Sequence, residues 1–421
     1  MIQTTTLASG LRVVTERMPE AHSVAVGAWV GVGARDEPAE LAGVSHFLEH
    51  LLFKGTEERS ARAIAAAVDR VGGDMNAFTA KEYTAYYCRV PATELPLALE
   101  LLGDVLTVPA LRDGDVDNER QVILEELAMD DDLPEDVVHR LLAEAMFPGH
   151  ALGRETAGTM ATVETITPDD VRAFFRHWYR PSSMVVAVAG ACDHDRVLAD
   201  VERRFPATGP VDLPQREAPA SEPAPLVVDR RRTEQVQLAL GFRGLPRGDA
   251  DREALDVLNH VLGGGPSSRL FEEIREQRGL AYAVGSGTAS YADAGSLVVS
   301  AGTAPAQVGE VLNLIDTEVA ALLTDGMTED ERETAVGYLT GAFVMGLEDN
   351  GSRMARLGAL LTTRGAVRPV EEQLERWRAV TPADVARVTE RILDQPRSLA
   401  VVGPVSEASL RRGGRRRATP A

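Results

Sequence analysis

The chain has 421 residues, 44% of them hydrophobic and 26% charged, so it can bury a sizeable core and is not expected to be disordered. A net charge of −20 argues against nucleic-acid binding, because that binding depends on Lys and Arg side chains that neutralise phosphates. The sequence has no run of 18 apolar residues, so we expect no membrane-spanning helix.

The N-terminal segment and the cysteines bear on the cellular compartment. The first residues lack a basic region followed by an apolar region, so they do not have the pattern of a secretory signal. Cys88 and Cys192 are the only cysteines and have no CxxC spacing, which excludes a disulfide framework and predicts two buried free thiols. We therefore expect a soluble cytoplasmic protein.

Strand and helix patterns alternate along the first half of the chain. Apolar residues at every second position from Val24 to Val30 predict a strand, and helical periodicity follows around residues 41–53. Residues 74–87 alternate again and are rich in strand-favouring side chains, which predicts another strand. MVVAVAG at residues 184–190 predicts a buried strand that ends in glycine.

The second half repeats this order. TITPDDV at residues 165–171 matches AVTPADV at residues 379–385, 214 positions later, and in each copy a Thr before Pro predicts the start of a helix. Upstream, GDVDNER at residues 114–120 faces GMTEDER at residues 326–332, 212 positions later. The matching segments indicate an internal duplication.

The segment between the two copies is rich in proline. Six prolines lie within residues 206–225, which excludes a helix and predicts an extended, semi-rigid linker. We therefore predict an α+β fold in which two homologous domains, residues 1–205 and 226–410, flank this linker in a clamshell-like arrangement. The tail at 411–421 begins with five arginines in seven residues and is expected to be a flexible basic end.

The helix expected at 41–53 contains HFLEH, from His46 to His50. Two histidines four positions apart project from one face of a helix and can bind one ion, and Glu49 shares that face. A carboxylate beside a zinc-bound water is the arrangement that removes a proton during attack on a carbonyl. Neutral imidazoles with a carboxylate suit zinc, so the motif predicts a zinc site that needs a third ligand from elsewhere. A structural helix with two surface histidines is the alternative.

An acidic segment at residues 119–127 is the candidate source of that ligand. Glu119 and Glu126 are seven positions apart, or two helical turns, and so share one face, whereas Glu125 is expected to be exposed. In isolation such a segment would be an ordinary solvent-facing acidic helix. With HFLEH upstream, it becomes the expected source of the third ligand.

These residues carry a family resemblance. HFLEH followed by Glu126 resembles the inverted zinc motif of the inverzincins, the pitrilysin-like (M16) metallopeptidases. The likeness extends over almost the whole chain, including the duplication, and more closely resembles bacterial single-chain relatives of the mitochondrial processing peptidase beta subunit. It implies that His46, His50 and Glu126 bind one Zn²⁺ per chain. It further implies that Glu49 is the general base and that Glu119 supports the ligand geometry.

A glycine-rich segment begins at Gly263 in the second half. It lacks the lysine of a phosphate-binding loop and the GxGxxG pattern, so nucleotide binding is not expected. It resembles the second-domain motif of the same family, in which an Arg and a Tyr seven positions apart contact the substrate and its tetrahedral intermediate. Arg275 and Tyr282 have that spacing, and a guanidinium and a phenol can both donate to a developing oxyanion. A surface Arg and a core Tyr without that role are the alternative.

The duplicated half lacks the metal ligands. The positions that face the four residues of the metal motif at an offset of 212 are apolar or aromatic: Leu258, Val261, Leu262 and Tyr338. The nearby His260 is expected to be a satisfied core or capping histidine.

The resemblance also implies substrate contacts. In the family, the segment that matches Asn76, Ala77 and Phe78 is an edge strand to which an extended peptide adds, and an ordinary paired strand is the alternative. In processing-type relatives, acidic residues after the zinc-binding Glu recognise arginine. Asp136 occupies the first such position but Arg140 occupies the second, which argues against presequence-like arginine specificity. The net charge still favours basic peptides.

Together these features predict a zinc metalloendopeptidase that cleaves extended oligopeptides or unfolded, presequence-like segments. Two homologous domains supply half of an enclosed chamber, so we expect a homodimer that acts on peptides and binds neither nucleic acid nor membrane. The alternatives are a non-catalytic core-like scaffold subunit and an obligate heterodimer subunit of a processing peptidase. The intact metal motif argues against the first. The presence of Arg275 and Tyr282 in the same chain argues against the second.

Overall fold

The computed structural model describes residues 2–410, and the basic tail expected at 411–421 lies outside the described residues. The chain forms two compact units, each assembled from more than one segment. Within the described residues, unit 1 comprises 2–128, 154–215 and 343–368, and unit 2 comprises 129–153, 216–342 and 369–410.

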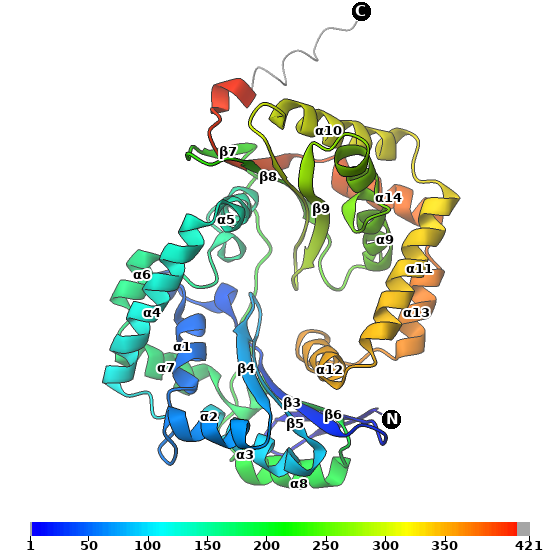
Figure 1. Cartoon of the computed structure of the whole chain (residues 1–421). Helices are drawn as coiled ribbons and strands as arrows, with labels where there is room; N and C mark the ends of the chain where they lie inside the picture. The colour runs from blue at the N-terminus through cyan, green and yellow to red at the C-terminus, as the bar shows by residue number, and fades with distance from the viewer. Residues whose placement is uncertain (1, 411–421) are drawn as a thin grey trace, which may run out of the picture. The chain divides into compact units, whose positions relative to one another are not determined.

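Unit 1 is built on a six-stranded sheet in the order β1-β2-β6-β3-β5-β4 (Figure 1). The strands are β1 (Ile2–Thr6), β2 (Arg12–Arg17), β3 (Ser23–Val30), β4 (Asp74–Thr79), β5 (Thr84–Pro91) and β6 (Met184–Gly190). The helices are α1 (Val44–Leu52), α2 (Ala61–Arg70), α3 (Leu95–Thr107), α4 (Asp113–Asp132, in this unit to residue 128), α6 (Met160–Thr165), α7 (Pro168–Trp178), α8 (His194–Arg204) and α12 (Asn350–Arg364).

Unit 2 is built on a five-stranded sheet in the order β7-β11-β8-β10-β9. The strands are β7 (Leu226–Asp229), β8 (Val236–Gly244), β9 (Ala281–Ser290), β10 (Gly295–Thr303) and β11 (Arg397–Val402). The helices are α5 (Pro134–Met146), α9 (Arg252–Gly263), the π-helix η6 (Phe271–Glu276), α10 (Val308–Thr324), α11 (Glu329–Gly346, in this unit to residue 342), α13 (Val370–Arg378) and α14 (Pro382–Leu393).

The two sheets share one plan. The order β2-β6-β3-β5-β4 in unit 1 corresponds to β7-β11-β8-β10-β9 in unit 2, and in each the first pair is parallel and the others are antiparallel. Thr167 and Thr381 cap α7 and α14 through reciprocal bonds with Asp170 and Asp384. The structure therefore confirms the α+β fold with two duplicated domains.

Each half of the chain contributes one helix to the sheet of the other half. α12 packs on β2, β3 and β6 in unit 1, and α5 packs on β8 and β11 in unit 2 (Figure 1). The boundaries expected from the sequence, 1–205 and 226–410, were drawn on the sequence repeats and do not coincide with the two compact units. The physical reason is that one face of each sheet buries its apolar side chains under a helix from the other repeat.

A glycine makes room for each exchanged helix. A Cβ added at Gly27 of β3 would lie 2.6 Å from the Sδ of Met354 on α12. A Cβ added at Gly241 of β8 would lie 2.0 Å from the Sδ of Met146 on α5. At the offset of 212 that relates these parts of the two repeats, Gly27 corresponds to Ala239, so each sheet accommodates its exchanged helix through a glycine at a different position.

Residues 74–87 form a hairpin instead of the single strand that the alternation predicted. β4 ends at Thr79 and β5 begins at Thr84. The intervening turn contains Glu82, whose carboxylate forms a buried ion pair with Arg35 at 2.7 Å. Among the strands of the described residues, β4 pairs only with β5, so it is an edge strand.

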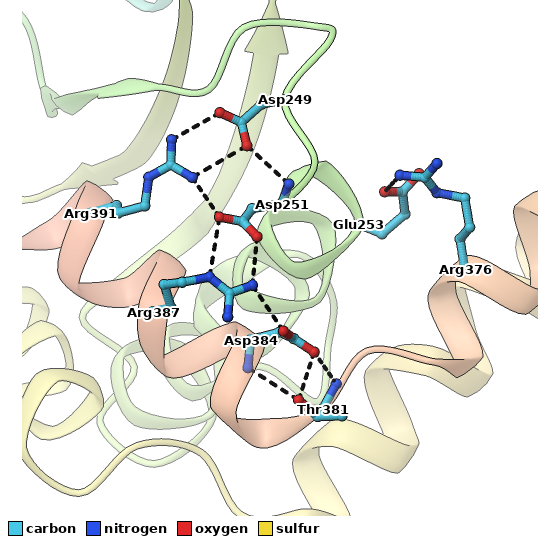
Figure 2. Close-up of polar contacts among 8 residues, drawn as sticks. All are labelled: Asp249, Asp251, Glu253, Arg376, Thr381, Asp384, Arg387 and Arg391. Carbon is cyan, nitrogen blue, oxygen red and sulfur yellow. Dashed lines mark hydrogen bonds and ion pairs between the residues drawn. The ribbon is translucent and has the colours of Figure 1, made fainter.

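Ion pairs connect the segment before α9 to α14 in unit 2 (Figure 2). The guanidinium of Arg387 lies 2.6 Å from the Asp251 carboxylate and 2.8 Å from that of Asp384. The guanidinium of Arg391 lies 2.8 Å from the Asp249 carboxylate and also contacts Asp251 at 2.5 Å. These contacts fix the start of α9 against α14.

Other sequence expectations can be compared directly with the structure. Cys88 and Cys192 are buried free thiols, as predicted, and burial raises the pKa of both. The proline-rich segment 206–225 contains no helix or strand. Within residues 2–410, no helix combines the length and the apolar character needed to cross a membrane.

Candidate metal centre

α1 carries both histidines of the HFLEH sequence on one face. The apolar residues of the helix are buried in the core of unit 1: Val44, Phe47, Leu48, Leu51 and Leu52. The rings of His46 and His50 lie edge to face with their centroids 4.7 Å apart, and their side chains are 19% and 18% exposed. Core packing thus holds the two imidazoles side by side near the surface.

Glu126 reaches this pair from α4. Its Oε2 lies 3.9 Å from His46 Nε2 and 3.6 Å from His50 Nε2. One potential ligand atom from each of the three residues lies within 4.8 Å of the other two. The structure therefore brings together the three residues that the resemblance implied as metal ligands. Glu125, the neighbouring carboxylate, is exposed, as predicted.

The three groups fit a zinc ion by their chemistry. Two imidazole nitrogens and one carboxylate oxygen are a common zinc donor set that leaves a fourth position open. Burial, together with the nearby His50, lowers the pKa of His46 to about 4, so its imidazole is neutral at physiological pH, as a metal ligand must be. The Nε2 atoms of both histidines point to the same carboxylate oxygen.

Glu119 contacts His50 on the side of the ring opposite Glu126. It is 5% exposed, and its Oε2 lies 3.2 Å from His50 Nδ1, the nitrogen that does not face Glu126. Its Oε1 lies 2.6 Å from the Nζ of Lys54. A carboxylate on the second nitrogen fixes the tautomer and orientation of a ligating imidazole. The sequence analysis placed Glu119 but missed Lys54, which follows HFLEH by four positions and looks like an ordinary surface lysine.

Glu49 is held by the edge strand. The hydroxyl of Thr79, the last residue of β4, donates to Glu49 Oε2 at 2.6 Å. Burial raises the pKa of Glu49, while the Thr79 hydrogen bond and the nearby His50 oppose that change. The carboxylate therefore combines partial burial with a fixed orientation, which suits proton transfer. Sequence analysis missed Thr79, because nothing in the strand pattern distinguishes it from its neighbours.

The expected substrate strand lies at the edge of the sheet, next to this site. Asn76, Ala77 and Phe78 are in β4, and the side chain of Asn76 accepts a bond from the Ala77 amide at 2.8 Å. Phe78 is 40% exposed and packs beside Tyr83 and Tyr87. The edge position agrees with the expectation and, in the described part of the chain, leaves one side of β4 without a strand partner.

Arg275 and Tyr282 lie together in unit 2. The guanidinium of Arg275 lies over the ring of Tyr282 at 4.5 Å and over that of Phe271 at 4.7 Å. Tyr282 is 79% exposed, so it is not the core tyrosine of the alternative interpretation. The two aromatic rings hold the guanidinium in place through cation–π contacts.

Three further residues of the sequence analysis also lie in unit 2. Asp136 is exposed in the first turn of α5, and Arg140 on the same helix pairs with Asp131 at 2.8 Å. His260 is buried, as expected for a core histidine, but its Nε2 has no hydrogen-bond partner among residues 2–410, so the expectation of a satisfied side chain is not met. Its ring stacks on Tyr338 instead, with centroids 4.3 Å apart.

Comparisons with known proteins give matches over most of the chain. Residues 12–160 match the family described as Insulinase (Peptidase family M16), and residues 165–339 match the one described as Peptidase M16 inactive domain. An uncharacterised zinc protease of Streptomyces coelicolor is 46% identical over 414 residues, covering 96% of this chain and 90% of that protein. The uncharacterised zinc protease YmxG of Bacillus subtilis is 37% identical, covering 96% and 98%.

Solved structures show the same fold. A crystal structure of a peptidase M16 inactive domain from Pseudomonas fluorescens matches with a TM-score of 0.90 at 22% identity, covering 96% of this chain and 98% of that one. A protease from Helicobacter pylori matches with a TM-score of 0.87 at 23% identity, covering 96% and 99%.

Proposed function

Since the chain belongs to peptidase family M16, we propose that it is a zinc metalloendopeptidase that hydrolyses peptide bonds in extended oligopeptides or unfolded segments. The observation that carries the proposal is the convergence of His46, His50 and Glu126, with Glu49 on the same helix as both histidines. One zinc ion would be held in each chain.

A zinc ion in this position supplies Lewis-acid chemistry, because it acidifies water and polarises a carbonyl. Glu49 would take the proton of the attacking water and later deliver it to the leaving amine. Thr79 orients the Glu49 carboxylate for this transfer through its 2.6 Å hydrogen bond. Glu119, held by Lys54, keeps the His50 ring in the tautomer that leaves Nε2 free to bind the metal.

β4 would bind the peptide by strand addition. Its free edge offers main-chain hydrogen bonds that accept many sequences, and Asn76, Ala77 and Phe78 would line the added strand. We assign to Arg275 and Tyr282 the role of substrate-contacting hydrogen-bond donors. Asp136 would add to an acidic environment that favours basic peptides, in keeping with the net charge of −20.

The proposed assembly is a cytoplasmic homodimer that needs no other subunit for cleavage. Light scattering on the purified chain gives the oligomeric state directly. A chain that binds zinc but cleaves peptides only after a second, different chain is added would favour an obligate heterodimer subunit.

The test compares wild type with Glu49→Gln on a library of quenched fluorescent peptides of graded length and charge. Glutamine can still accept the hydrogen bond from Thr79, and the substitution leaves both histidines in place, so we expect unchanged zinc content. Glutamine cannot take a proton from water, so cleavage should fall about 10²- to 10⁴-fold. The matched control is Glu125→Gln, an exposed carboxylate on α4 next to Glu126, which should leave cleavage unchanged. Equal cleavage by wild type and Glu49→Gln would overturn the mechanism. A wild type without zinc and without cleavage would favour a scaffold subunit.

A further inference from the structure

We propose that Glu37 is a positioning residue of the metal centre, which fixes the first turn of α1 and thereby the two histidine ligands from outside the HFLEH motif. This inference rests on the proposed metal function. Glu37 does not contact the metal-binding groups, and it would act only through the backbone of the helix that carries them.

The Glu37 carboxylate caps α1 with both of its oxygens. Oε2 accepts a hydrogen bond from the Gly43 amide at 2.8 Å, and Oε1 accepts one from the Ser45 amide at 2.7 Å. Ser45 directly precedes His46. The residue is 4% exposed, so water does not compete strongly for these bonds. The amides of a first helical turn have no partners within the helix, and Glu37 supplies the acceptors.

The N-cap residue itself cannot do this. Gly43 occupies that position with φ +98°, a conformation that side chains rarely adopt, and it has no side-chain acceptor. A Cβ at Gly43 would also lie 2.5 Å from the carbonyl oxygen of Ala157. The close packing at this point therefore excludes a capping Ser, Thr or Asp, and the acceptor has to come from a different segment.

Burying the Glu37 carboxylate at this cap costs desolvation free energy. Burial raises the pKa of Glu37 to about 7, although the two amides and Arg154 act in the opposite direction. Other helices of unit 1 use exposed Ser, Thr or Asp caps, such as Ser60 on α2 and Asp193 on α8, which avoid that desolvation penalty. Two hydrogen bonds from one carboxylate restrain the start of α1 more than the single bond of such a cap does. A negative charge also interacts favourably with a helix N-terminus.

The loop that carries Glu37 is itself anchored. The guanidinium of Arg154 donates to the Glu37 carbonyl at 2.8 Å. The amides of Ala34 and Arg35 donate to the carbonyls of Ala80 and Lys81 at 3.0 and 2.9 Å. Residues 80 and 81 follow directly after Thr79, which holds Glu49. The loop that caps α1 and the strand end that holds Glu49 are therefore joined by backbone hydrogen bonds.

The expected consequence is a defect in metal binding. Glu37→Gln keeps the size and shape of the side chain but has one acceptor oxygen. Its NH₂ group would therefore face one of the two backbone amides, and two donors cannot bond to each other. The first turn of α1 would then be less ordered in the metal-free chain. Part of the free energy of metal binding would be used to order it, which lowers the affinity. We expect zinc and cobalt to bind about tenfold more weakly, at the lower end of what residues behind the metal ligands contribute.

The test is a Co²⁺ titration of the metal-free full chain, followed by its visible absorption, with Zn²⁺ affinity from competition against a chelator. Glu37→Gln should raise both dissociation constants about tenfold and alter the cobalt spectrum, because the ligand geometry changes. Hydrogen exchange of the Ser45 amide in the metal-free chain should become faster. The matched control is Asp193→Ala, which removes a carboxylate cap from α8 in the same unit and should leave all three readouts unchanged.

Unchanged affinity and spectrum in Glu37→Gln would overturn the inference, as would an equal loss in Asp193→Ala, which would mark a general loss of stability. None of these readouts requires peptide cleavage. A wild type that binds cobalt but cleaves no peptide would contradict the proposed function and leave the role of Glu37 standing. A wild type that binds no metal would overturn both.

Discussion

The two units share a sheet plan but differ at the helix pair that carries the metal ligands in unit 1. There, partly exposed side chains from α1 and α4 converge: His46, His50 and Glu126. At an offset of 212, the corresponding positions of unit 2 hold Leu258, Leu262 and Tyr338.

Unit 2 uses these positions for packing. Leu258 and Leu262 are fully buried in its core, and Tyr338 stacks on His260. A histidine therefore remains on α9, but its ring packs against another ring. The comparison teaches that the duplicated scaffold alone does not make a metal centre. A few side chains on one helix pair decide between a binding site and a core.

The units also differ in how the start of the corresponding helix is held. In unit 1, the buried carboxylate of Glu37 bonds directly to amides at the start of α1. In unit 2, the Asp249 carboxylate accepts one hydrogen bond from the Asp251 amide at 2.9 Å, and ion pairs of Asp249 and Asp251 with α14 fix the start of α9 (Figure 2). Two buried bonds to backbone amides fix a helix start more tightly than one such bond with partly exposed ion pairs does.

The largest effect is expected from giving unit 1 the leucine that unit 2 has. His50→Leu removes one of three ligands, so we expect zinc content to fall from about one per chain to near zero. Cleavage should fall about 10³-fold or more, since a catalytic metal contributes several kcal/mol. Metal analysis and peptide cleavage check this. The reciprocal Leu262→His should gain no second zinc. Full zinc content in His50→Leu would contradict the account.

A smaller effect is expected at Lys54, for which unit 2 has Pro266 at the corresponding position. Lys54→Met removes the ammonium group 2.6 Å from Glu119, leaving that carboxylate free to turn away from His50. We expect zinc affinity to fall about tenfold, with Lys54→Arg close to wild type because it retains the cation. Competition with a chelator measures both. Equal affinities in Lys54→Met and wild type would show that Glu119 needs no support.

The smallest effect is expected at the ion pairs of unit 2. The hydrogen bond from Arg387 lowers the pKa of Asp251, with burial opposing it, so the ionised carboxylate stabilises the folded state. That contribution is present above the ordinary pKa of 3.8 and is lost as the pH falls below it. At pH 7, Asp251→Asn should lower Tm by about 2–4 °C.

The difference from wild type should shrink as the pH falls below about 4, because the wild-type carboxyl is then also neutral. Thermal unfolding across this pH range measures it. Asp169→Asn in unit 1, at a 94% exposed side chain, is the control and should not change Tm. A difference that grows at low pH would contradict the assignment, and zinc content should remain that of wild type in both variants.

Much of the fold and the core of the site could be predicted from the sequence. The duplication was visible because the Thr-Pro-x-Asp cap is a local pattern that both copies keep. The histidine pair was visible because residues four positions apart on a helix share a face. Glu126 lies on a different helix, and its role as a ligand was predicted from the family resemblance.

The remaining features depend on contacts between distant segments. Thr79, Lys54 and Glu37 are common residue types whose roles arise only when β4, α4 and the loops on either side of α1 meet. The exchange of α5 and α12 was also missed, because an amphipathic pattern does not specify which sheet a helix covers. The hairpin at 74–87 was missed because alternation continues on both sides of its turn.

Anomalous diffraction at the zinc edge from crystals of the zinc-loaded chain tests the central claim most directly. The account predicts one strong peak per chain, within coordination distance of His46 Nε2, His50 Nε2 and a Glu126 carboxylate oxygen, with His50 Nδ1 still bonded to Glu119. A peak held by other residues, or no peak at these three groups, would contradict it.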